Sequence, residues 1–251
     1  MKQIHNISAV LIVKNSENSL AQTLHSLESF KEVIVYDNGS SDTSKKIAQS
    51  FSNVILIEGT FDGFGTTKNK AASFATNDWI FFIDSDEVVS KKLLKTFSTL
   101  SLEKKTLYFI KRINFYKTQQ IKHCWGDDTL ARLYNKKETS FTNAMVHESL
   151  QEKNLSKVYL HGNLLHYPYN TLSEFLIKAD RYSSAFAKEH KGKKNSSPTK
   201  AFLNGNFSFF KIYILKRGFL DGYAELVIAF SHMVTNFFKY MKLYELNKEM
   251  V

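Results

Sequence analysis

The chain contains one cysteine, two prolines and ten glycines in 251 residues. The single cysteine, Cys124, excludes a disulfide within the chain and is typical of a reducing compartment. So little proline and glycine predicts no long flexible linker. The first residues lack the apolar length and the small-residue cleavage site of a signal peptide. We therefore expect a cytosolic globular protein, built as one large domain or as a domain with an appendage.

Long apolar runs are also missing. The uncharged run 226–238 is far shorter than the ~20 apolar residues that a membrane-spanning helix needs. The net charge is +10, and much of the excess lies beyond residue 185. Such a balance suits nucleic acid, an anionic membrane surface or acidic small molecules, while solvated surface lysine is the ordinary alternative. Aromatic residues lie among these cations, which favours either helices on an anionic leaflet or the core of a helical appendage.

Short apolar runs alternate with helix-like segments in the first third of the chain. Strands are predicted over 7–13, 33–36, 53–57 and 79–83, with helices between them. Strands that alternate with helices at this spacing indicate βαβ units and a mostly parallel sheet.

The rhythm changes after residue 86. The pattern predicts a helix over 91–100, a strand over 107–115 and a loop-rich stretch over 116–145, with short strands near Leu133 and Val158. A helix is expected from Thr171, followed by a linker over 191–199. Two aromatic-rich helices are expected over 207–240, broken near the glycine pair at 218–222.

Three acids follow the strand predicted over 79–83: Asp84, Asp86 and Glu87. Open α/β sheets bind ligands at the carboxyl ends of their strands, and carboxylates there suit a hard divalent cation shared with phosphates. The alternative is a solvated acidic turn that caps the next helix.

Two further polar loops, 14–17 and 37–42, follow the first two predicted strands and would open on the same edge of a parallel sheet. A fourth loop, 63–69, contains Gly63, Gly65 and Lys68, with Lys68 expected in the first turn of a helix. A Gly-x-Gly before a helix is weak by itself, and its spacing is not the dinucleotide fingerprint.

These four motifs together resemble the nucleotide-binding half of the inverting glycosyltransferases of family 2, which have the GT-A fold. The matching segments are 13–17, 36–44, 63–69 and 83–87. The resemblance implies an α/β GT-A fold with a Rossmann-like, mostly parallel sheet and a C-terminal helical appendage. It also implies a site for a nucleoside diphosphate sugar and a divalent cation, Mg²⁺ or Mn²⁺.

The resemblance assigns roles to residues of the first half. Lys14 and Glu17 would belong to the donor site, and Asp37 would bind the nucleobase, usually uracil. Lys68 would lie near the donor phosphates or ribose, Asp84 would contact the ribose or the metal, and Asp86 would bind the metal. Ser16, often acidic in relatives, makes the role of Glu17 less secure.

The second half resembles bacterial lipopolysaccharide core glucosyltransferases, which add β-glucose to an inner-core heptose. The matching segments are 125–128, 132–134, 146–148, 217–222 and 239–243, together with His166. The resemblance implies acceptor or diphosphate contacts from Trp125, Arg132 and His147, with His147 as a further metal ligand or a partner of Glu148. Gly126 and Asp127 depart from the pattern expected before the acid, which puts the shape of the acceptor loop in question.

Inversion by direct displacement needs a general base for the acceptor hydroxyl. Asp128 and Glu148 are the candidates, with Asp127 third. Plain structural readings compete with each role, because a lone histidine often serves a structural hydrogen bond, Asp127 and Asp128 would end a loop, and Arg132 would pair with a loop acid.

We therefore expect a catalytic domain over 1–165, with a nucleotide-sugar half to residue 87 and an acceptor half over 88–165, followed by a helical region over 166–251. The expected enzyme transfers a hexose from a UDP-sugar to a lipid-linked oligosaccharide at the cytoplasmic face of the inner membrane, held there by anionic lipid. Glucose and a lipopolysaccharide heptose are the donor sugar and acceptor that the resemblance favours. Capsule, teichoic acid or peptide acceptors are the alternative. A nucleic-acid-binding module is a weaker hypothesis, because the acids of the site would repel phosphate.

Overall fold

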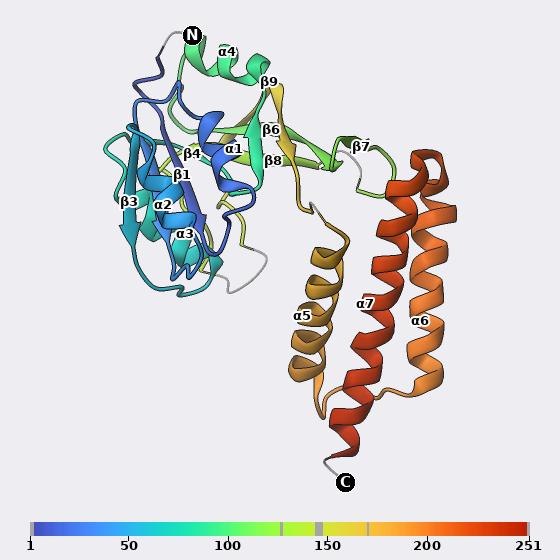
Figure 1. Ribbon diagram of the computed structural model, residues 1–251. Helices are drawn as coiled ribbons and strands as arrows, with labels where there is room; N and C mark the ends of the chain where they lie inside the picture. Colours follow the sequence, from blue (N-terminus) through green and yellow to red (C-terminus); the bar gives the residue numbers. More distant parts are fainter. Residues whose placement is uncertain (1–2, 126–127, 144–147, 170, 250–251) are drawn as a thin grey trace. The chain divides into compact units, whose positions relative to one another are not determined.

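The computed structural model describes residues 3–125, 128–143, 148–169 and 171–249 (Figure 1). The chain divides into two compact units. The first unit comprises residues 1–113 and 127–166, and the second comprises residues 114–126 and 167–251. Each unit has buried apolar clusters of its own.

A sheet with the strand order β3-β2-β1-β4-β8-β6-β9-β5 organises the first unit. Its strands are β1 Ser8–Val13, β2 Val33–Asp37, β3 Val54–Glu58, β4 Trp79–Phe82, β5 Glu87–Val89, β6 Thr106–Tyr116, β8 Asp128–Asn135 and β9 Ser156–His166. Its helices are α1 Leu20–His25, α2 Ser44–Gln49, α3 Phe64–Ser73 and α4 Lys91–Thr99.

The strands β3, β2, β1 and β4 run parallel, as the sequence predicts. Val13 at the end of β1 pairs with Asp37 at the end of β2, and Asp37 pairs in turn with Glu58 at the end of β3. The loops that follow these strands therefore leave the sheet at one edge. That edge is where a parallel sheet presents a ligand site.

Both faces of β1, β2 and β4 are buried, which explains their continuous apolar sequences, while the edge strand β3 is partly exposed. Side chains alternate along β1, so that Ala9 and Leu11 join the cluster that includes residues of α1, α2 and α4, while Val10 joins the cluster that includes α3. Helices thus cover the sheet on both sides, which makes this half a doubly wound α/β layer structure.

The remaining strands add an antiparallel part to the sheet. β4 pairs with β8, β8 with β6, and β5 with β9, all antiparallel, so the sheet is parallel only in its first half. The strands expected to be short near Leu133 and Val158 span eight and eleven residues. Their alternation is hidden because β8 is buried mainly in its second half and β9 is largely exposed until its last residues.

Helix α3 also begins earlier than predicted. Gly63, with φ +95°, ends the preceding loop, and the helix starts at Phe64, so Lys68 lies in the second helical turn. Glycine adopts such positive φ values without strain, which explains how the chain turns abruptly into the helix.

The second unit is built from long helices. They are α5 Leu172–His190, α6 Pro198–Phe210 and α7 Gly222–Lys248, with a π-helical turn Lys211–Leu215 and a 3₁₀ turn Gly218–Asp221 between the last two. Strand β7 Gln119–Ile121 pairs with the end of β6. Figure 1 shows α7 between α5 and α6. A Cβ atom on Gly205 of α6 would lie 3.1 Å from the Met233 carbonyl oxygen of α7, so glycine permits the close packing of these two helices.

Candidate active site

Hydrogen bonds join the loops that follow β1 and β2. The amide of Asn15 donates to Ser40 Oγ (2.9 Å), and the amide of Ser16 donates to Ser44 Oγ (2.8 Å). In return, the amide of Ser41 donates to Asn15 Oδ1 (2.8 Å). The two polar loops at the carboxyl edge are therefore one fixed structure.

The proposed donor residues Lys14 and Glu17 differ in their contacts. Glu17 accepts hydrogen bonds from the amide of Thr43 (3.1 Å) and from its hydroxyl (2.8 Å), so it caps the start of α2. Lys14 is exposed on the same loop. Glu17 thus has a structural task, and its role in donor binding stays a prediction.

Asp37 ends β2 and is buried. Its Oδ1 accepts hydrogen bonds from the amides of Gly39 (3.0 Å) and Ser40 (2.9 Å). Its Oδ2 is also buried but has no hydrogen-bond partner among the described residues. Buried carboxylate oxygens are costly when unpaired, so this atom is suited to accept an N–H from a ligand.

An alternating chain of charges runs through the first unit and joins five of the predicted site residues. In it Lys68, Arg132 and Arg112 each lie between two carboxylates. The contacts, in order, are Glu148 Oε1 to Lys68 Nζ 2.5 Å, Lys68 Nζ to Asp84 Oδ1 3.9 Å, Asp84 Oδ2 to Arg132 Nη2 2.6 Å, Arg132 Nη2 to Glu87 Oε1 2.7 Å, Glu87 Oε1 to Arg112 Nη1 3.4 Å, and Arg112 Nη2 to Asp128 Oδ2 2.6 Å. We call this set the ion chain.

Arg132 and Glu87 are the most buried side chains of the ion chain, at 6% and 0% exposure, and Asp84 beside them is partly exposed. Burial would raise the pKa of the Asp84 carboxyl, but the charges of Arg132 and Lys68 outweigh burial and hold that pKa well below its ordinary value. Burial, together with the negative charge of Asp84, raises the pKa of Glu87. Burial also opposes the charge of Arg132, yet the two carboxylates raise its pKa. Arg132 therefore pairs with Asp84 and Glu87. Pairing with a loop acid was the structural alternative to a substrate contact for this residue.

Lys68 lies at the other buried position of the ion chain. Its ammonium lies 4.6 Å from the ring centroid of Phe82 and 5.1 Å from that of Phe141. Aromatic faces attract a cation, so the two rings and Glu148 hold this charge in place beside Asp84.

Asp86 and His166 form a second pair at the carboxyl edge. His166 ends β9, and its Nε2 lies 3.5 Å from Asp86 Oδ2. His166 belongs to the motifs of the second half but had no predicted role, although a histidine at the end of a strand can reach a site at the sheet edge. The structure adds it to the candidate metal residues.

The residues present fit a divalent cation. Asp86 offers a partly exposed carboxylate and His166 an imidazole, and both groups are ligands of Mn²⁺, while Mg²⁺ prefers the oxygens. Among the described residues no group of three or more His, Cys, Asp or Glu side chains is placed to hold an ion. Further ligands would have to come from a bound diphosphate, as is usual where a metal is shared with phosphates. Asp127 and His147, the other predicted residues, lie outside the described residues.

Trp125 belongs to the second unit. Its ring stacks on Tyr169 with centroids 5.7 Å apart, and its carbonyl oxygen accepts a hydrogen bond from Asn114 Nδ2 (3.0 Å). Its contact with an acceptor stays a prediction.

Residues just before Trp125 are fastened to the start of α7. The amides of Lys122 and His123 donate to Asp221 Oδ2 (2.7 and 3.0 Å), and the amide of Cys124 donates to Glu225 Oε1 (2.8 Å). Asp221 and Glu225 are both buried. We call these contacts the loop clamp, since they hold the segment that leads into Asp127 and Asp128.

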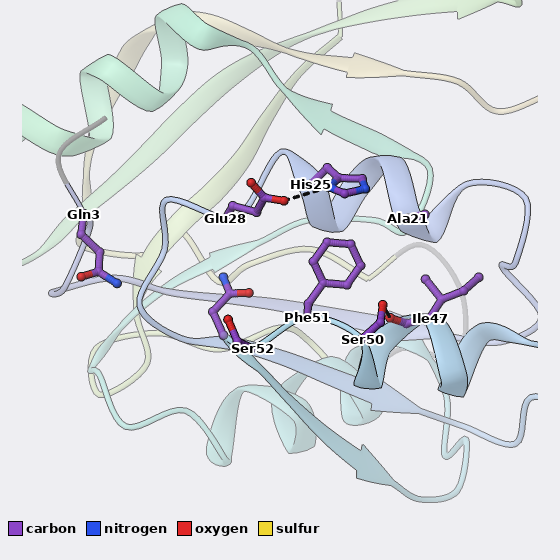
Figure 2. A pocket seen from close by; sticks show the side chains of 9 residues that line it. Gln3, Ala21, His25, Glu28, Ile47, Ser50, Phe51 and Ser52 are labelled. Carbon is purple, nitrogen blue, oxygen red and sulfur yellow. Dashed lines mark hydrogen bonds and ion pairs between the residues drawn. The ribbon is translucent and has the colours of Figure 1, made fainter.

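A separate cleft of about 570 Å³ lies between α1 and α2, beside their C-terminal ends (Figure 2). Figure 2 shows His25 and Glu28 turned toward each other, with His25 Nδ1 2.8 Å from Glu28 Oε1. The ring of His25 lies edge-on to Phe51 at 4.9 Å. None of the residues that line this cleft belongs to the ion chain or to the Asp86–His166 pair.

Comparison with known proteins connects this geometry with a family. Residues 8–150 match the family model for glycosyl transferase family 2. An uncharacterized glycosyltransferase of Rickettsia typhi is 30% identical over 257 aligned residues, which cover 96% of this chain and 87% of that protein. A poly(ribitol-phosphate) beta-glucosyltransferase of Bacillus spizizenii is 32% identical over 43% of this chain and 19% of its own length.

The fold is also similar to that of a solved structure, S. aureus TarS 1-349 in complex with UDP-GlcNAc. The TM-score is 0.49 at 13% identity, and the alignment covers 93% of this chain and 90% of that one. The family match spans more than half of the chain and contains the parallel strands and the whole ion chain. The chain belongs to glycosyl transferase family 2.

Proposed function

We propose that this family 2 enzyme is a metal-dependent, inverting transferase that moves a hexose from a UDP-sugar to an oligosaccharide acceptor. The observation that carries the proposal is that Asp37 from the end of β2, Lys68 from α3, and Asp84 and Asp86 from the loop after β4 all belong to one α/β unit, with Lys68 Nζ 3.9 Å from Asp84 Oδ1. Such an edge can receive a nucleotide and its diphosphate together.

The donor would be held by groups of opposite character. Asp37 Oδ2 would accept the N–H of a uracil ring, because this buried oxygen otherwise lacks a partner. The fixed ammonium of Lys68 would attract the phosphates or the ribose. Asp86 and His166 would hold Mg²⁺ or Mn²⁺ together with oxygens of the bound diphosphate, and Asp84 would contact the ribose. When bound, the metal would stabilise the negative charge that develops on the leaving diphosphate.

Asp128 is our choice as the general base. Its side chain is 45% exposed, whereas that of Glu148 is 14% exposed and lies 2.5 Å from Lys68. An acceptor hydroxyl must reach the base directly, so the more exposed carboxylate is better suited. Arg112 would orient Asp128 through the 2.6 Å contact and leave its other oxygen for the hydroxyl. Glu148 remains the alternative.

Glucose as the sugar and a lipopolysaccharide inner-core heptose as the acceptor rest on the resemblance of the second-half motifs. A teichoic-acid-type acceptor is the alternative with independent support, since a relative is named a poly(ribitol-phosphate) beta-glucosyltransferase. A lipid-linked acceptor would place the enzyme at the cytoplasmic face of the inner membrane, beside anionic lipid. No helix within the described part of the chain is both long and apolar enough to cross a bilayer.

Transfer of labelled sugar tests the proposal. The purified chain would be supplied with UDP-glucose, Mn²⁺ and, in parallel, truncated heptose-terminated lipopolysaccharide, poly(ribitol-phosphate) and a peptide mixture. Label on the heptose acceptor, in the β configuration by NMR, supports the full proposal. Label only on poly(ribitol-phosphate) moves the acceptor to the alternative, and an α-linked product contradicts inversion.

A further inference from the structure

The turn between α6 and α7 carries an apolar surface that nothing in the second unit covers. The exposed side chains lie on the end of α6, the π-helical and 3₁₀ turns and the start of α7. We call them the helical tip: Phe207, Phe210, Ile214, Leu215, Phe219, Leu220, Tyr223, Leu226 and Phe230. Large exposed apolar surfaces on folded proteins mark interaction sites.

The exposure of the helical tip does not result from poor packing of the second unit. On the inner side of the same elements, Ile212, Ala224 and Ile228 are buried in the cluster that fills the second unit. A Cβ atom on Gly218 would lie 2.9 Å from the Ile212 carbonyl oxygen, so the turn is closely packed. The turn is therefore closely packed on its inner side, while its other apolar side chains stay exposed on the outer side.

The charges around the helical tip have one sign. Lys211, Lys216 and Arg217 are exposed between its apolar residues, while Asp221 is buried. The sequence has no Asp or Glu over 190–220 but seven Lys or Arg. Apolar side chains interspersed with cations, and without exposed acids, match the interface of an anionic bilayer, which offers acyl chains and negative headgroups together.

A second copy of the chain fits this surface less well. In a symmetric dimer the same patch would meet itself, so Lys211 and Arg217 would approach their own copies at an interface that removes water. Like charges in such a setting repel, and no exposed acid of the turn is available to compensate.

We infer that the helical tip is a bilayer-contact element, which seats its apolar side chains among the acyl chains of an anionic membrane while its cations meet the lipid phosphates. This attachment would bring the enzyme to a lipid-linked acceptor, and that purpose rests on the proposed function. Attachment itself is measured without turnover. The loop clamp also connects the helical tip with the residues just before Trp125, because Asp221 and Glu225 accept hydrogen bonds from their amides.

Vesicle sedimentation of the full chain tests the inference. The probes are vesicles of phosphatidylcholine alone and of phosphatidylcholine mixed equally with phosphatidylglycerol, at low salt. The tip variant is Phe219→Ser with Leu220→Ser, whose side chains are 48% and 58% exposed. The matched control is Leu176→Ser with Ile177→Ser on α5, at 64% and 68% exposure. A third variant, Lys211→Gln with Arg217→Gln, tests the charges.

The wild type is expected to sediment with the anionic vesicles. The tip variant is expected to lose about a hundredfold in partition coefficient, since it removes two large apolar side chains and each contributes on the order of one power of ten when buried. The charge variant should lose the preference for anionic vesicles, and the control should match the wild type. Far-UV circular dichroism and slow donor hydrolysis, both unchanged, would show that the variants fold.

Three results would overturn the inference. They are a wild type that ignores anionic vesicles, a control variant that loses as much binding as the tip variant, and a protein that is dimeric by light scattering through the same tip residues without lipid. A chain that binds vesicles through the tip but turns over no UDP-sugar would instead overturn the proposed function and leave the inference standing.

Discussion

At the scale of single residues, each cation of the ion chain shares its charge between two carboxylates. Removing one partner of a buried pair leaves an uncompensated charge, which is more damaging than replacing the whole pair. The ion chain therefore connects one predicted metal-site residue, Asp84, with both candidate bases, Glu148 at one end and Asp128 at the other. Substitutions along it should be compared by kinetic constants, and not by loss of activity alone.

Two isosteric substitutions distinguish the candidate bases. Asp128→Asn should lower kcat for transfer to the acceptor by about 10²- to 10⁴-fold, the usual contribution of a general base, and leave the affinity for UDP almost unchanged. Glu148→Gln should mainly raise the KM for the UDP-sugar, because Lys68 loses the partner 2.5 Å away. Steady-state kinetics with the acceptor saturated measures both.

The assignment is reversed if the two variants exchange behaviour, with the larger loss of kcat in Glu148→Gln. Unfolding midpoints of both variants serve as the control, since Asn at position 128 also weakens the 2.6 Å contact with Arg112.

The sequence predicted the acids of the site better than their partners. Asp84 and Asp86 stand out because they directly follow a buried strand, where packing gives no reason for charge. Arg112 was missed because it lies inside β6, an apolar strand with a few polar residues, and its partners Glu87 and Asp128 come from distant segments. Pairings between strands far apart in sequence leave no local pattern to read.

At the scale of elements, the loop clamp gives a structural role to the motif over 217–222, which contains Asp221. Asp221 accepts two backbone amides, and Glu225 accepts a third, so the start of α7 holds an otherwise irregular segment. Burial opposes the ionised form of Asp221, but these amides and His123 lower its pKa nonetheless. Burial dominates at Glu225, whose pKa is raised, with the negative charge of Asp221 adding to the effect.

The raised pKa of Glu225 predicts how stability varies with pH. The native state holds this proton more tightly than the unfolded state, whose carboxyl has an ordinary value of 4.5. Stability from this group is therefore complete below that value and declines as pH rises through the native pKa. Glu225→Gln removes this decline, so urea midpoints of wild type and variant should diverge above about pH 4.5, with the wild type falling.

Parallel midpoint curves across this range would contradict the raised pKa. Asp221, Cys124 and Lys216 lie around Glu225 and remain in both proteins, so their titration cancels in the comparison. The variant also keeps an oxygen that can accept the Cys124 amide.

Elements were predictable where their pattern was regular. The four parallel strands with their intervening helices follow from apolar runs and polar loops, because β1, β2 and β4 are buried on both faces and the partly exposed β3 is still an apolar run. The antiparallel half was less visible. β8 and β9 change from exposed to buried along their length, and α6 begins at Pro198, within the segment expected to be a linker. Proline at the start of a helix is favoured, but it equally marks a loop in sequence.

At the scale of the whole molecule, charge is divided unevenly. The acidic residues that gather at the carboxyl edge of the first unit contrast with a second unit that has no acid over 190–220. This division suits an enzyme that handles a nucleotide and a metal in one unit and meets an anionic surface with the other. The family membership agrees with the first of these tasks, while the second depends on the vesicle experiment.

Donor turnover tests the central claim most directly. Wild type, Asp86→Ala and a control, Asp78→Ala, would be incubated with UDP-glucose, UDP-galactose and UDP-GlcNAc in Mn²⁺ or Mg²⁺. Asp78 pairs with Lys137 at 2.8 Å on an exposed surface, so its loss should change little. We predict slow hydrolysis of one donor, abolished by EDTA, reduced at least about a hundredfold in Asp86→Ala and kept in the control. If no donor is hydrolysed and UDP fails to bind with metal present, the acids after β4 are a solvated turn and the account is contradicted.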